Sequence, residues 1–313
     1  MKIIPRDQIE KILPSLDLMP EIEQAFQAYS EGRTVVPPVG ELLLDRGEVH
    51  IKYGYVKQHP YYVIKIASGF YEDPALEHMS SNGMMLLFSQ HNGQAICALL
   101  DEGLLTNIRT AVAGAIAAKY LAPERVDKIG IVGAGTQARL QLSYLKAVTS
   151  CRNVMVWGTS REELESYRLD MEREGFVIEY TEETAEIQEQ CRLIVTTTPS
   201  HTPLLLGDYL RRGTHITAVG SDTPYKQELD PEILGKADLV VADSMEQCLI
   251  RGEIHQAIKT GQLEKHQMIE LGQVIAGTNM GRESMDQITV ADLTGVAVQD
   301  MAIAEAVYNA SPA

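Results

Sequence analysis

The chain has 313 residues, 45% of them hydrophobic, a composition that suits a packed core and differs from that of disordered proteins. Its 27 basic and 43 acidic residues give a formal net charge of −16, which excludes nucleic acid as an expected partner because phosphate backbones are repelled. The four cysteines form no C-x-x-C pair, which argues against a disulfide framework and a metal site. The N-terminus lacks the apolar stretch of a signal peptide, and no apolar run approaches the roughly 18 residues of a membrane helix. We therefore expect a cytoplasmic protein that contacts no membrane.

The first hundred residues are predicted to begin with a helix, Glu21–Glu31, and to continue as a β-rich region. Turn signals such as Asn92-Gly93 separate the apolar segments of this region. A single alanine-rich helix is expected over residues 105–121, ending before Pro123. The predicted strands are Val39–Leu44, Val49–Tyr55, Tyr61–Ala67, Met84–Phe88 and Ala95–Leu100.

From residue 128 onward, predicted strands and helices alternate, which indicates βαβ units and a parallel, doubly wound sheet. The expected strands are KIGIV, NVMVW, FVIEY, LIVTT, HITAV and DLVVA. One more helix is predicted over residues 244–260, and a last helix over about residues 298–309. The expected fold class is therefore α/β, with a Rossmann-type doubly wound domain preceded by an α+β region.

A glycine-rich loop, Gly133 to Ala138, follows the first strand of this series and has the pattern G-x-G-x-x-A. The first glycine permits a tight turn, the second lets backbone N–H groups reach a pyrophosphate, and the small third residue allows close packing of helix and strand. The pattern alone is weak, but here it opens a βαβ series, so it predicts a dinucleotide cofactor at a helix N-terminus. The residues predicted to bind the cofactor are Gly133, Gly135, Thr136, Gln137 and, at the end of HITAV, Val219.

The end of the second strand, VMVWGTSREE, favours NADP(H) over NAD(H). Domains that bind NAD usually have an Asp or Glu at this place, about 20 residues beyond the glycines, where it meets the ribose. This chain has Gly158 there, followed by two hydroxyls and a cation that could hold a 2′-phosphate, Thr159, Ser160 and Arg161. An ordinary helix start, with Ser160 as N-cap and a solvated Arg161, fits the same residues, so NAD(H) is the alternative.

Five segments resemble the ornithine cyclodeaminase/mu-crystallin family, in the family's order and over nearly the full chain. They are VIKIASGFYED, LLTNIRTAVAGAIAAKYLAP, IGIVGAGTQARLQ, VGSDTPYKQELDP and DLTGVAVQD. The family includes alanine dehydrogenases, cyclic ketimine reductases and imino-acid reductases, and its members are usually homodimers. The resemblance implies that residues 1–122 and 295–313 form a substrate-binding and dimerisation domain, and that residues 123–294 form the Rossmann dinucleotide-binding domain.

The resemblance also implies roles for individual residues. Lys65 matches a lysine that contacts the substrate, Arg109 an arginine that binds its carboxylate, and Asp222 an acid that contacts its nitrogen. Thr294 matches a small polar residue near the nicotinamide. The residues alone leave other interpretations open: Lys65 as an outward strand residue, Arg109 in a structural salt bridge and Asp222 as a turn former. Thr294 and Asp300 could likewise be ordinary helix caps.

The chain departs from the family at an arginine that many members have after paired prolines, because Val39 stands in that place. Nearby, His50 and Lys52 occupy alternate positions of a predicted strand and therefore share one face. We expect Lys52 to replace part of the lost contact or to bind a second polar group of the substrate, with a solvated lysine as the alternative. Since a distal amine needs negative charge, His50 and Lys52 favour imine reduction over ornithine cyclisation, although Glu41 could supply an acid.

Together these residues predict an NAD(P)H-dependent reductase of an α-imino acid, linear or cyclic, which in reverse is an amino-acid dehydrogenase. Lys65 and Arg109 would hold the substrate carboxylate, and Asp222 would stabilise the iminium and act as the general acid/base, with Lys65 as a second catalytic residue. One alternative is an ornithine cyclodeaminase, which forms proline and ammonia with bound NAD. The other is a non-catalytic binder of nucleotides and small carboxylates, of the mu-crystallin type.

Overall fold

The computed structural model describes residues 1–70 and 81–312. The chain forms two compact units: unit 1 comprises Met1–Arg109 and Val296–Ala313, and unit 2 comprises Thr110–Gly295. The sequence suggests a first boundary after residue 122, whereas these units divide within helix α3 (Leu104–Leu121), after Arg109. The end of the VIKIASGFYED segment, residues 71–73, lies outside the described residues.

Unit 1 is built on a seven-stranded sheet with the order β1-β7-β6-β5-β4-β2, in which β3 pairs with β4. The pairs are antiparallel except for β1 with β7. The five strands expected from the sequence are present, and two short strands, β1 and β2, were not expected. The bounds are β1 Lys2–Pro5, β2 Thr34–Val35, β3 Gly40–Leu44, β4 Gly47–Val56, β5 Tyr61–Gly69, β6 Ser81–Ser89 and β7 Ala95–Leu100.

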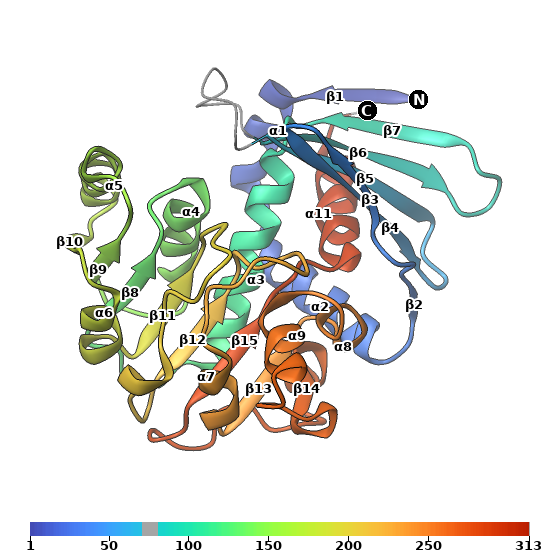
Figure 1. The fold of residues 1–313 in the computed structure, drawn as a ribbon. Helices are drawn as coiled ribbons and strands as arrows, with labels where there is room; N and C mark the ends of the chain where they lie inside the picture. The colour runs from blue at the N-terminus through green and yellow to red at the C-terminus, as the bar shows by residue number, and fades with distance from the viewer. Residues whose placement is uncertain (71–80, 313) are drawn as a thin grey trace. The chain divides into compact units, whose positions relative to one another are not determined.

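The C-terminal helix α11 (Ala297–Ala310) lies along one face of this sheet, next to α2 (Leu18–Ser30) (Figure 1). The remaining helical segments before the sheet are α1 (Arg6–Ile12) and the 3-10 turn η1 (Leu13–Ser15). Unit 1 therefore joins both ends of the chain, and the Lys2 ammonium donates a hydrogen bond of 2.8 Å to the Ser311 hydroxyl.

The opposite face of the same sheet, which we call the outer face, is apolar. Directly paired residues such as Ile51 with Ile66 and Ile64 with Leu86 point to this side, and the Tyr62 and Phe88 rings stack there at 4.9 Å. These side chains are half-buried or exposed, and among the described residues of unit 1 no helix covers them. The outer face comprises Ile51, Tyr53, Tyr62, Ile64, Ile66, Met84, Leu86, Phe88 and Leu100.

Unit 2 contains an eight-stranded sheet with the order β10-β9-β8-β11-β12-β15-β13-β14. All its pairs are parallel, which confirms the predicted Rossmann-type doubly wound sheet. The six strands expected from the sequence are present, while β14 and β15 were not expected. The bounds are β8 Ile129–Val132, β9 Asn153–Trp157, β10 Val177–Thr181, β11 Leu193–Thr196, β12 His215–Ala218, β13 Leu239–Ala242, β14 Met268–Glu270 and β15 Thr289–Asp292.

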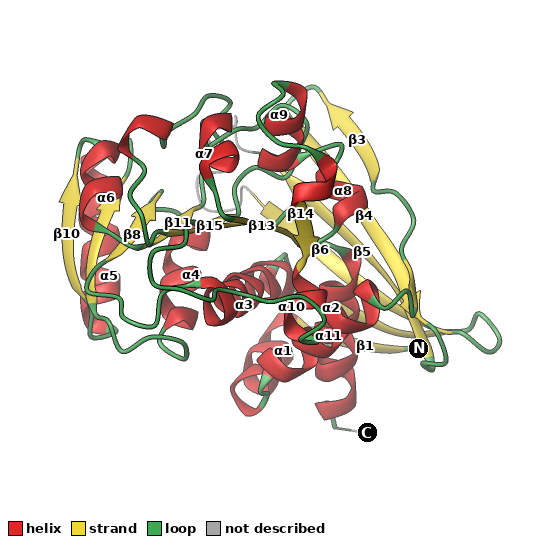
Figure 2. Ribbon diagram, turned by 90° about the horizontal axis from the view of Figure 1, so that it is seen from below, coloured by secondary structure: helices red, strands yellow, loops and turns green. Residues whose placement is uncertain are grey.

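Helices lie on both faces of this sheet, with α4 on one side and α7 and α9 on the other (Figure 2). The prediction of one helix over residues 244–260 is wrong, because the chain forms two, α8 (Met245–Cys248) and α9 (Gly252–Lys259). Between them Arg251 is extended and Gly252 has φ +85°, so the helical path is broken. The other helices are α4 Thr136–Leu145, α5 Arg161–Arg173, α6 Thr184–Gln190, η3 Gly207–Tyr209, α7 Pro231–Lys236, η4 Lys265–Gln267 and α10 Leu271–Ile275.

None of the helices in the described ranges combines the length and the apolar character that crossing a bilayer requires. Over the same residues, no group of His, Cys, Asp and Glu side chains has the arrangement of a metal site.

Candidate functional site

The glycine-rich loop of unit 2 fits a dinucleotide pyrophosphate. Gly133 has φ +113°, and a Cβ added there would lie 2.6 Å from the Thr197 hydroxyl, so both the turn and the close packing require glycine. Gly135 is the N-cap residue of α4 and provides no capping side chain, while a Cβ built on it would meet no atom within 4 Å. The helix therefore begins with uncapped N–H groups beside open space, which is the arrangement that binds phosphate.

The residues that follow β9 form a capped helix start. The Ser160 hydroxyl accepts a hydrogen bond of 3.4 Å from the backbone N–H of Glu163, so its role as N-cap is confirmed. Thr159 and Arg161 are exposed, and the first turn of α5 also carries two acids, Glu162 and Glu163. The capping bond does not exclude a second contact of Ser160 with a ribose or a phosphate, because a hydroxyl oxygen has two lone pairs.

Unit 1 brings Lys65 and Arg109 together on a single acid, Asp300. The Lys65 ammonium lies 3.1 Å from Asp300 Oδ2, and Arg109 Nε lies 3.0 Å from Asp300 Oδ1. Arg109 Nη1 also donates a hydrogen bond of 2.6 Å to the side-chain oxygen of Gln299. Lys52 lies directly opposite Lys65 in the β4–β5 ladder, and both lysines are buried, with exposed fractions of 5% and 2%. The sheet thus carries two buried lysines on one side, and helix α3 adds the buried Arg109. An outward, solvated Lys65 or Lys52 is excluded.

Burial has a large effect on the protonation of Lys65. Its pKa falls from 10.5 to about 7, because the ammonium loses water and the Arg109 guanidinium repels it, while Asp300 opposes the shift. Since the folded pKa lies below the unfolded one, the neutral amine contributes folding stability that is present above pH 10.5 and is lost as the pH falls through about 7. Lys65 can therefore exchange a proton near neutral pH.

A second acid in this region, Asp101, holds the start of helix α3. Asp101 Oδ2 accepts a hydrogen bond of 2.8 Å from the backbone N–H of Leu105, so the helix that carries Arg109 is capped. Burial raises the pKa of Asp101 to about 6, against the opposing effects of this hydrogen bond and of Lys65. Neither Asp101 nor the pairing of Asp300 was expected from the sequence.

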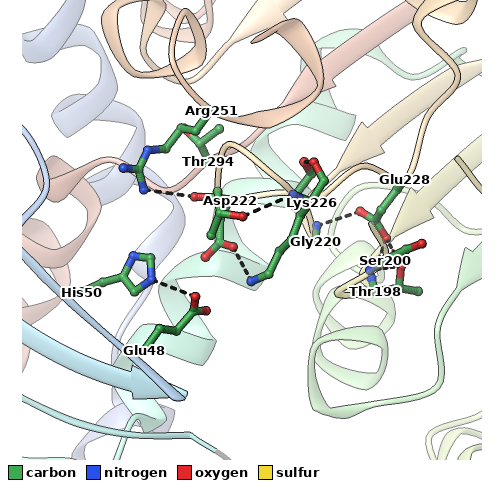
Figure 3. Close-up of polar contacts among 12 residues, drawn as sticks. Glu48, His50, Thr198, Ser200, Gly220, Asp222, Lys226, Glu228, Arg251 and Thr294 are labelled. Carbon is green, nitrogen blue, oxygen red and sulfur yellow. Dashed lines mark hydrogen bonds and ion pairs between the residues drawn. The ribbon is translucent and has the colours of Figure 1, made fainter. Parts of the chain in front are cut away.

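His50 lies in an acidic setting, contrary to its use in the sequence argument as positive charge. Its Nε2 is 3.5 Å from Glu48 Oε2, a contact drawn in Figure 3, and 3.7 Å from Glu41 Oε1. The register that places Glu41 opposite His50 explains this, because β3 and β4 form an antiparallel hairpin. The region beside Lys52 therefore contains two carboxylates as well as a histidine, which weakens the electrostatic argument against an amine ligand.

Asp222 follows β12 in a turn of unit 2 that is closed by local contacts. Its Oδ1 accepts a hydrogen bond of 2.8 Å from the Lys226 ammonium, and its backbone oxygen accepts one of 3.1 Å from Arg251 (Figure 3). The Ser221 hydroxyl donates to the backbone oxygen of Lys226 at 2.7 Å. Asp222 has a side-chain exposure of 37%, whereas Lys226 has 10%, so the carboxylate is accessible and the cation behind it is not.

The Thr294 side chain forms hydrogen bonds with other residues of unit 2, and it does not cap the helix that follows it. Its hydroxyl donates to Asp243 Oδ1 at 3.0 Å and accepts from Gln247 at 2.8 Å. The N-cap position of α11 is Val296, which makes no side-chain cap. The interpretation of Thr294 and Asp300 as helix caps is therefore wrong.

A sequence model of the ornithine cyclodeaminase/mu-crystallin family matches residues 2–312. The chain belongs to this family. One of its relatives, an uncharacterised cyclodeaminase of Sinorhizobium fredii, is 40% identical to it over 99% of this chain and 95% of the relative.

Solved structures of family members are also similar. An archaeal alanine dehydrogenase, described as a dimer with bound NAD, has a TM-score of 0.90 and 32% identity, covering 99% of this chain and 95% of that one. The Δ1-pyrroline-2-carboxylate reductase of Thermococcus litoralis, solved with NADH and L-proline, has a TM-score of 0.93 and 27% identity over 99% of this chain and 97% of that one.

In this member of the ornithine cyclodeaminase/mu-crystallin family, the residues predicted to form the site are divided between the two units. Unit 1 holds Lys52, Lys65 and Arg109, and unit 2 holds the glycine loop with Asp222. The sequence missed Asp300, although one signal was available, since it is an acid near the start of a helix that is otherwise mostly apolar.

Proposed function

We propose that this protein is an NAD(P)H-dependent reductase of an α-imino acid, linear or cyclic, which in reverse oxidises an amino acid. In this proposal Lys65 and Arg109 hold the substrate carboxylate, Asp222 faces the substrate nitrogen, and Lys52 contributes a further polar contact. The glycine loop, Val219, Thr294 and the residues after β9 hold the cofactor. The T. litoralis relative, a pyrroline-2-carboxylate reductase solved with NADH and L-proline, supports this reaction class.

The observation that carries the proposal is the buried cation cluster of unit 1. Two cations share Asp300, and a third, Lys52, lies opposite Lys65. Burying cations is costly unless anions compensate them, so such a cluster suits a ligand that brings a carboxylate. Asp300 and Gln299 orient Arg109 through Nε and Nη1, and a planar guanidinium has a second terminal nitrogen for a carboxylate.

When bound, a reduced nicotinamide supplies hydride to the substrate carbon. The residues of the chain then have three tasks. Lys65 and Arg109 orient the substrate through its carboxylate, so that a single carbon is presented for reaction. Asp222, as a carboxylate kept in place by Lys226, stabilises the positive charge of the iminium. Lys65, with a pKa lowered to about 7 by burial, can take up or release a proton in the neutral range.

A second candidate function is cyclodeamination of ornithine or a related diamino acid. The contacts of His50 with Glu41 and Glu48 favour it, because carboxylates near the substrate-binding strand could hold a distal amine. The S. fredii relative is also described as a cyclodeaminase. Both acids lie within 3.7 Å of His50, however, and Lys52 follows two residues after His50 on the same strand, so we rank this function below imine reduction.

One assay distinguishes these functions. The protein is incubated with NADPH or NADH and with imines formed from α-keto acids and amines, including cyclic ones, and cofactor absorbance is followed. We expect net oxidation of the cofactor. Formation of proline and ammonia from ornithine without net change of the cofactor would identify the cyclodeaminase instead. Cofactor binding without any turnover would identify a non-catalytic binder.

We also propose NADPH as the preferred cofactor, because Gly158 stands where an acid would repel the 2′-phosphate and Arg161 is exposed nearby. In the substitution Arg161→Ala, KM for NADPH is expected to rise roughly tenfold, about 1.4 kcal/mol, while KM for NADH stays within twofold. Lys236→Ala, which removes an exposed cation elsewhere in unit 2, is the control. Equal use of NADH and NADPH by the unmodified protein would contradict the preference.

We further propose a homodimer formed through the outer face of the unit 1 sheet. An apolar face of this extent is typical of an interface, and the archaeal alanine dehydrogenase relative is a dimer. Ile64→Asp, in the middle of that face, is expected to reduce the mass measured by light scattering from twice 34.6 kDa to 34.6 kDa. Leu169→Asp changes an exposed leucine of unit 2 and should leave the mass unaltered. A monomeric unmodified protein would refute the proposal.

A further inference from the structure

Unit 2 contains a buried carboxylate, that of Glu228, which binds the turns after two neighbouring strands. Its Oε1 accepts hydrogen bonds from the backbone N–H and the hydroxyl of Thr198, at 2.5 and 2.8 Å. Its Oε2 accepts from the Thr196 hydroxyl at 2.7 Å. The same oxygen accepts from the backbone N–H of Gly220 at 2.9 Å (Figure 3). Thr196 ends β11 and Gly220 follows β12, and these strands pair directly. One side chain therefore connects two turns at the carboxyl edge of the sheet.

The contact between these turns is so close that only glycine fits at position 220. A Cβ added to Gly220 would lie 2.1 Å from the backbone oxygen of Thr198 and 2.6 Å from Glu228 Oε2. Asp222 is two residues beyond Gly220 in the same turn. The position of Asp222 therefore depends on a turn whose backbone is hydrogen-bonded to the Glu228 carboxylate.

Glu228 is itself held on both sides of its backbone. Its N–H donates to Glu253 Oε1 at 2.7 Å, and its carbonyl accepts from Leu204 at 2.7 Å. Glu253 lies in the first turn of α9, where the next N–H, that of Ile254, donates to Asp292 Oδ2 at 2.8 Å. These contacts form a continuous path from β15, through α9, to the turn of Asp222. Because the backbone of Glu228 is held in place, its carboxylate can hold the turns of Thr198 and Gly220 in place.

We propose that Glu228 is a positioning residue of the reaction, whose carboxylate holds the turn after β12 so that Asp222 keeps the orientation that imine reduction requires. This inference rests on the proposed role of Asp222. No part of it requires Glu228 to touch substrate or cofactor. The four donors match an ionised carboxylate, which accepts hydrogen bonds at both oxygens and donates none.

If Glu228 positions Asp222, the protonation of Glu228 should change the reaction rate with pH. A side chain that only fills space would produce no such pH dependence. Burial raises the pKa of Glu228 to about 7, against the hydrogen bonds from the two threonines and Gly220. The acids that face it, Glu253 from α9 and Asp292 from β15, also have pKa values raised by burial, and Lys226 in the same turn is paired with Asp222. When Glu228 is protonated, the hydrogen on its carboxyl group competes with the four hydrogens that the carboxylate accepts. One of the four hydrogen bonds is then weakened or lost. Turnover should therefore increase as the pH rises through about 7.

Glu228→Gln is the first test. An amide can accept at one end only, so either the Thr198 or the Gly220 N–H loses its partner. We expect kcat for the imine to fall at least roughly tenfold, with the dissociation constant of NAD(P)H within about twofold, since small misplacements of catalytic groups have large effects. The acidic limb of the pH profile should disappear, and backbone amide exchange at Gly220 should become faster. Glu232→Gln, in an exposed pair with Lys236, is the matched control.

Thr196→Val is a milder second test if Glu228→Gln does not fold. It removes one donor to the carboxylate and keeps the shape of the side chain. The acidic limb should move to higher pH, and kcat should fall about twofold to fivefold. The proposal would be overturned if each variant that folds showed the kcat, the pH profile and the rate of backbone amide exchange at Gly220 of the unmodified protein. If the unmodified protein reduces no imine, exchange at Gly220 still decides: faster exchange in the variants supports the anchoring role, and unchanged exchange rejects it.

Discussion

Replacing Asp222 with alanine is expected to abolish imine reduction while cofactor binding persists. Asp222 is the accessible carboxylate of its turn, and the proposal gives it the positive charge of the iminium to stabilise. Removing one such electrostatic group typically lowers kcat by about 10²- to 10³-fold, and loss of a general acid/base adds to this. Steady-state kinetics with the best imine of the panel measures the loss. Fluorescence titration with NAD(P)H should give a dissociation constant within about twofold of that of the unmodified protein.

Two controls separate the catalytic role of Asp222 from a structural one. Asp127→Asn changes an aspartate that is 78% exposed in an ion pair with Arg125, and it should leave kcat unaltered. Lys226→Met removes the cation that pairs with Asp222. If Asp222 served only to form that pair, Lys226→Met would lower kcat as much as Asp222→Ala does. Full turnover by Asp222→Ala would remove Asp222 from the mechanism.

The variant Asp300→Asn is expected to weaken substrate binding and to shift its pH dependence. The amide leaves Lys65 and Arg109 buried without their shared anion, a change that for buried pairs costs about 3 kcal/mol or more in the free energy of unfolding. With both cations less ordered, KM for the imino acid should rise roughly 10- to 100-fold, about 1.4–2.8 kcal/mol. Thermal denaturation and steady-state kinetics measure the two effects.

The pH dependence of KM tests the contact between Lys65 and Asp300, because the direction of the expected shift is known. Lys65 binds a carboxylate best as ammonium, so KM should increase as the pH rises above its pKa of about 7. Asp300 raises that pKa, and without its charge the increase in KM should begin at lower pH. Asp7→Asn, in an exposed pair with Lys11 of the same unit, should leave the profile unmoved. An unshifted profile in Asp300→Asn would show that Asp300 does not set the protonation of Lys65.

The parts of the site that lie in one short segment could be predicted from the sequence. The glycine loop is an example, because Gly133 and Gly135 act through their own backbone between a strand and the helix that follows it. The N-cap role of Ser160 is another, since its partner is three residues away. By contrast, the helix expected over residues 244–260 is interrupted at Gly252, where an added Cβ would lie 2.6 Å from Asp292 Oδ2. That contact, with a residue about 40 positions away, is invisible in the local pattern.

By itself, the sequence predicted most of the strands and helices, the Rossmann-type domain and the membership of the family, because periodicity and motif spacing can be read along the chain. Among the described residues it missed four strands and the break between α8 and α9. Only the tertiary structure decided which charges meet. Lys65, Arg109 and Asp300 come from three distant segments, and their pairing results from the burial of a strand against the last helix. Glu228, too, acts on turns that precede it by 8 and 30 residues. A carboxylate has no preferred sequence separation from its partners, and burial, which makes such partners necessary, is set by the whole fold.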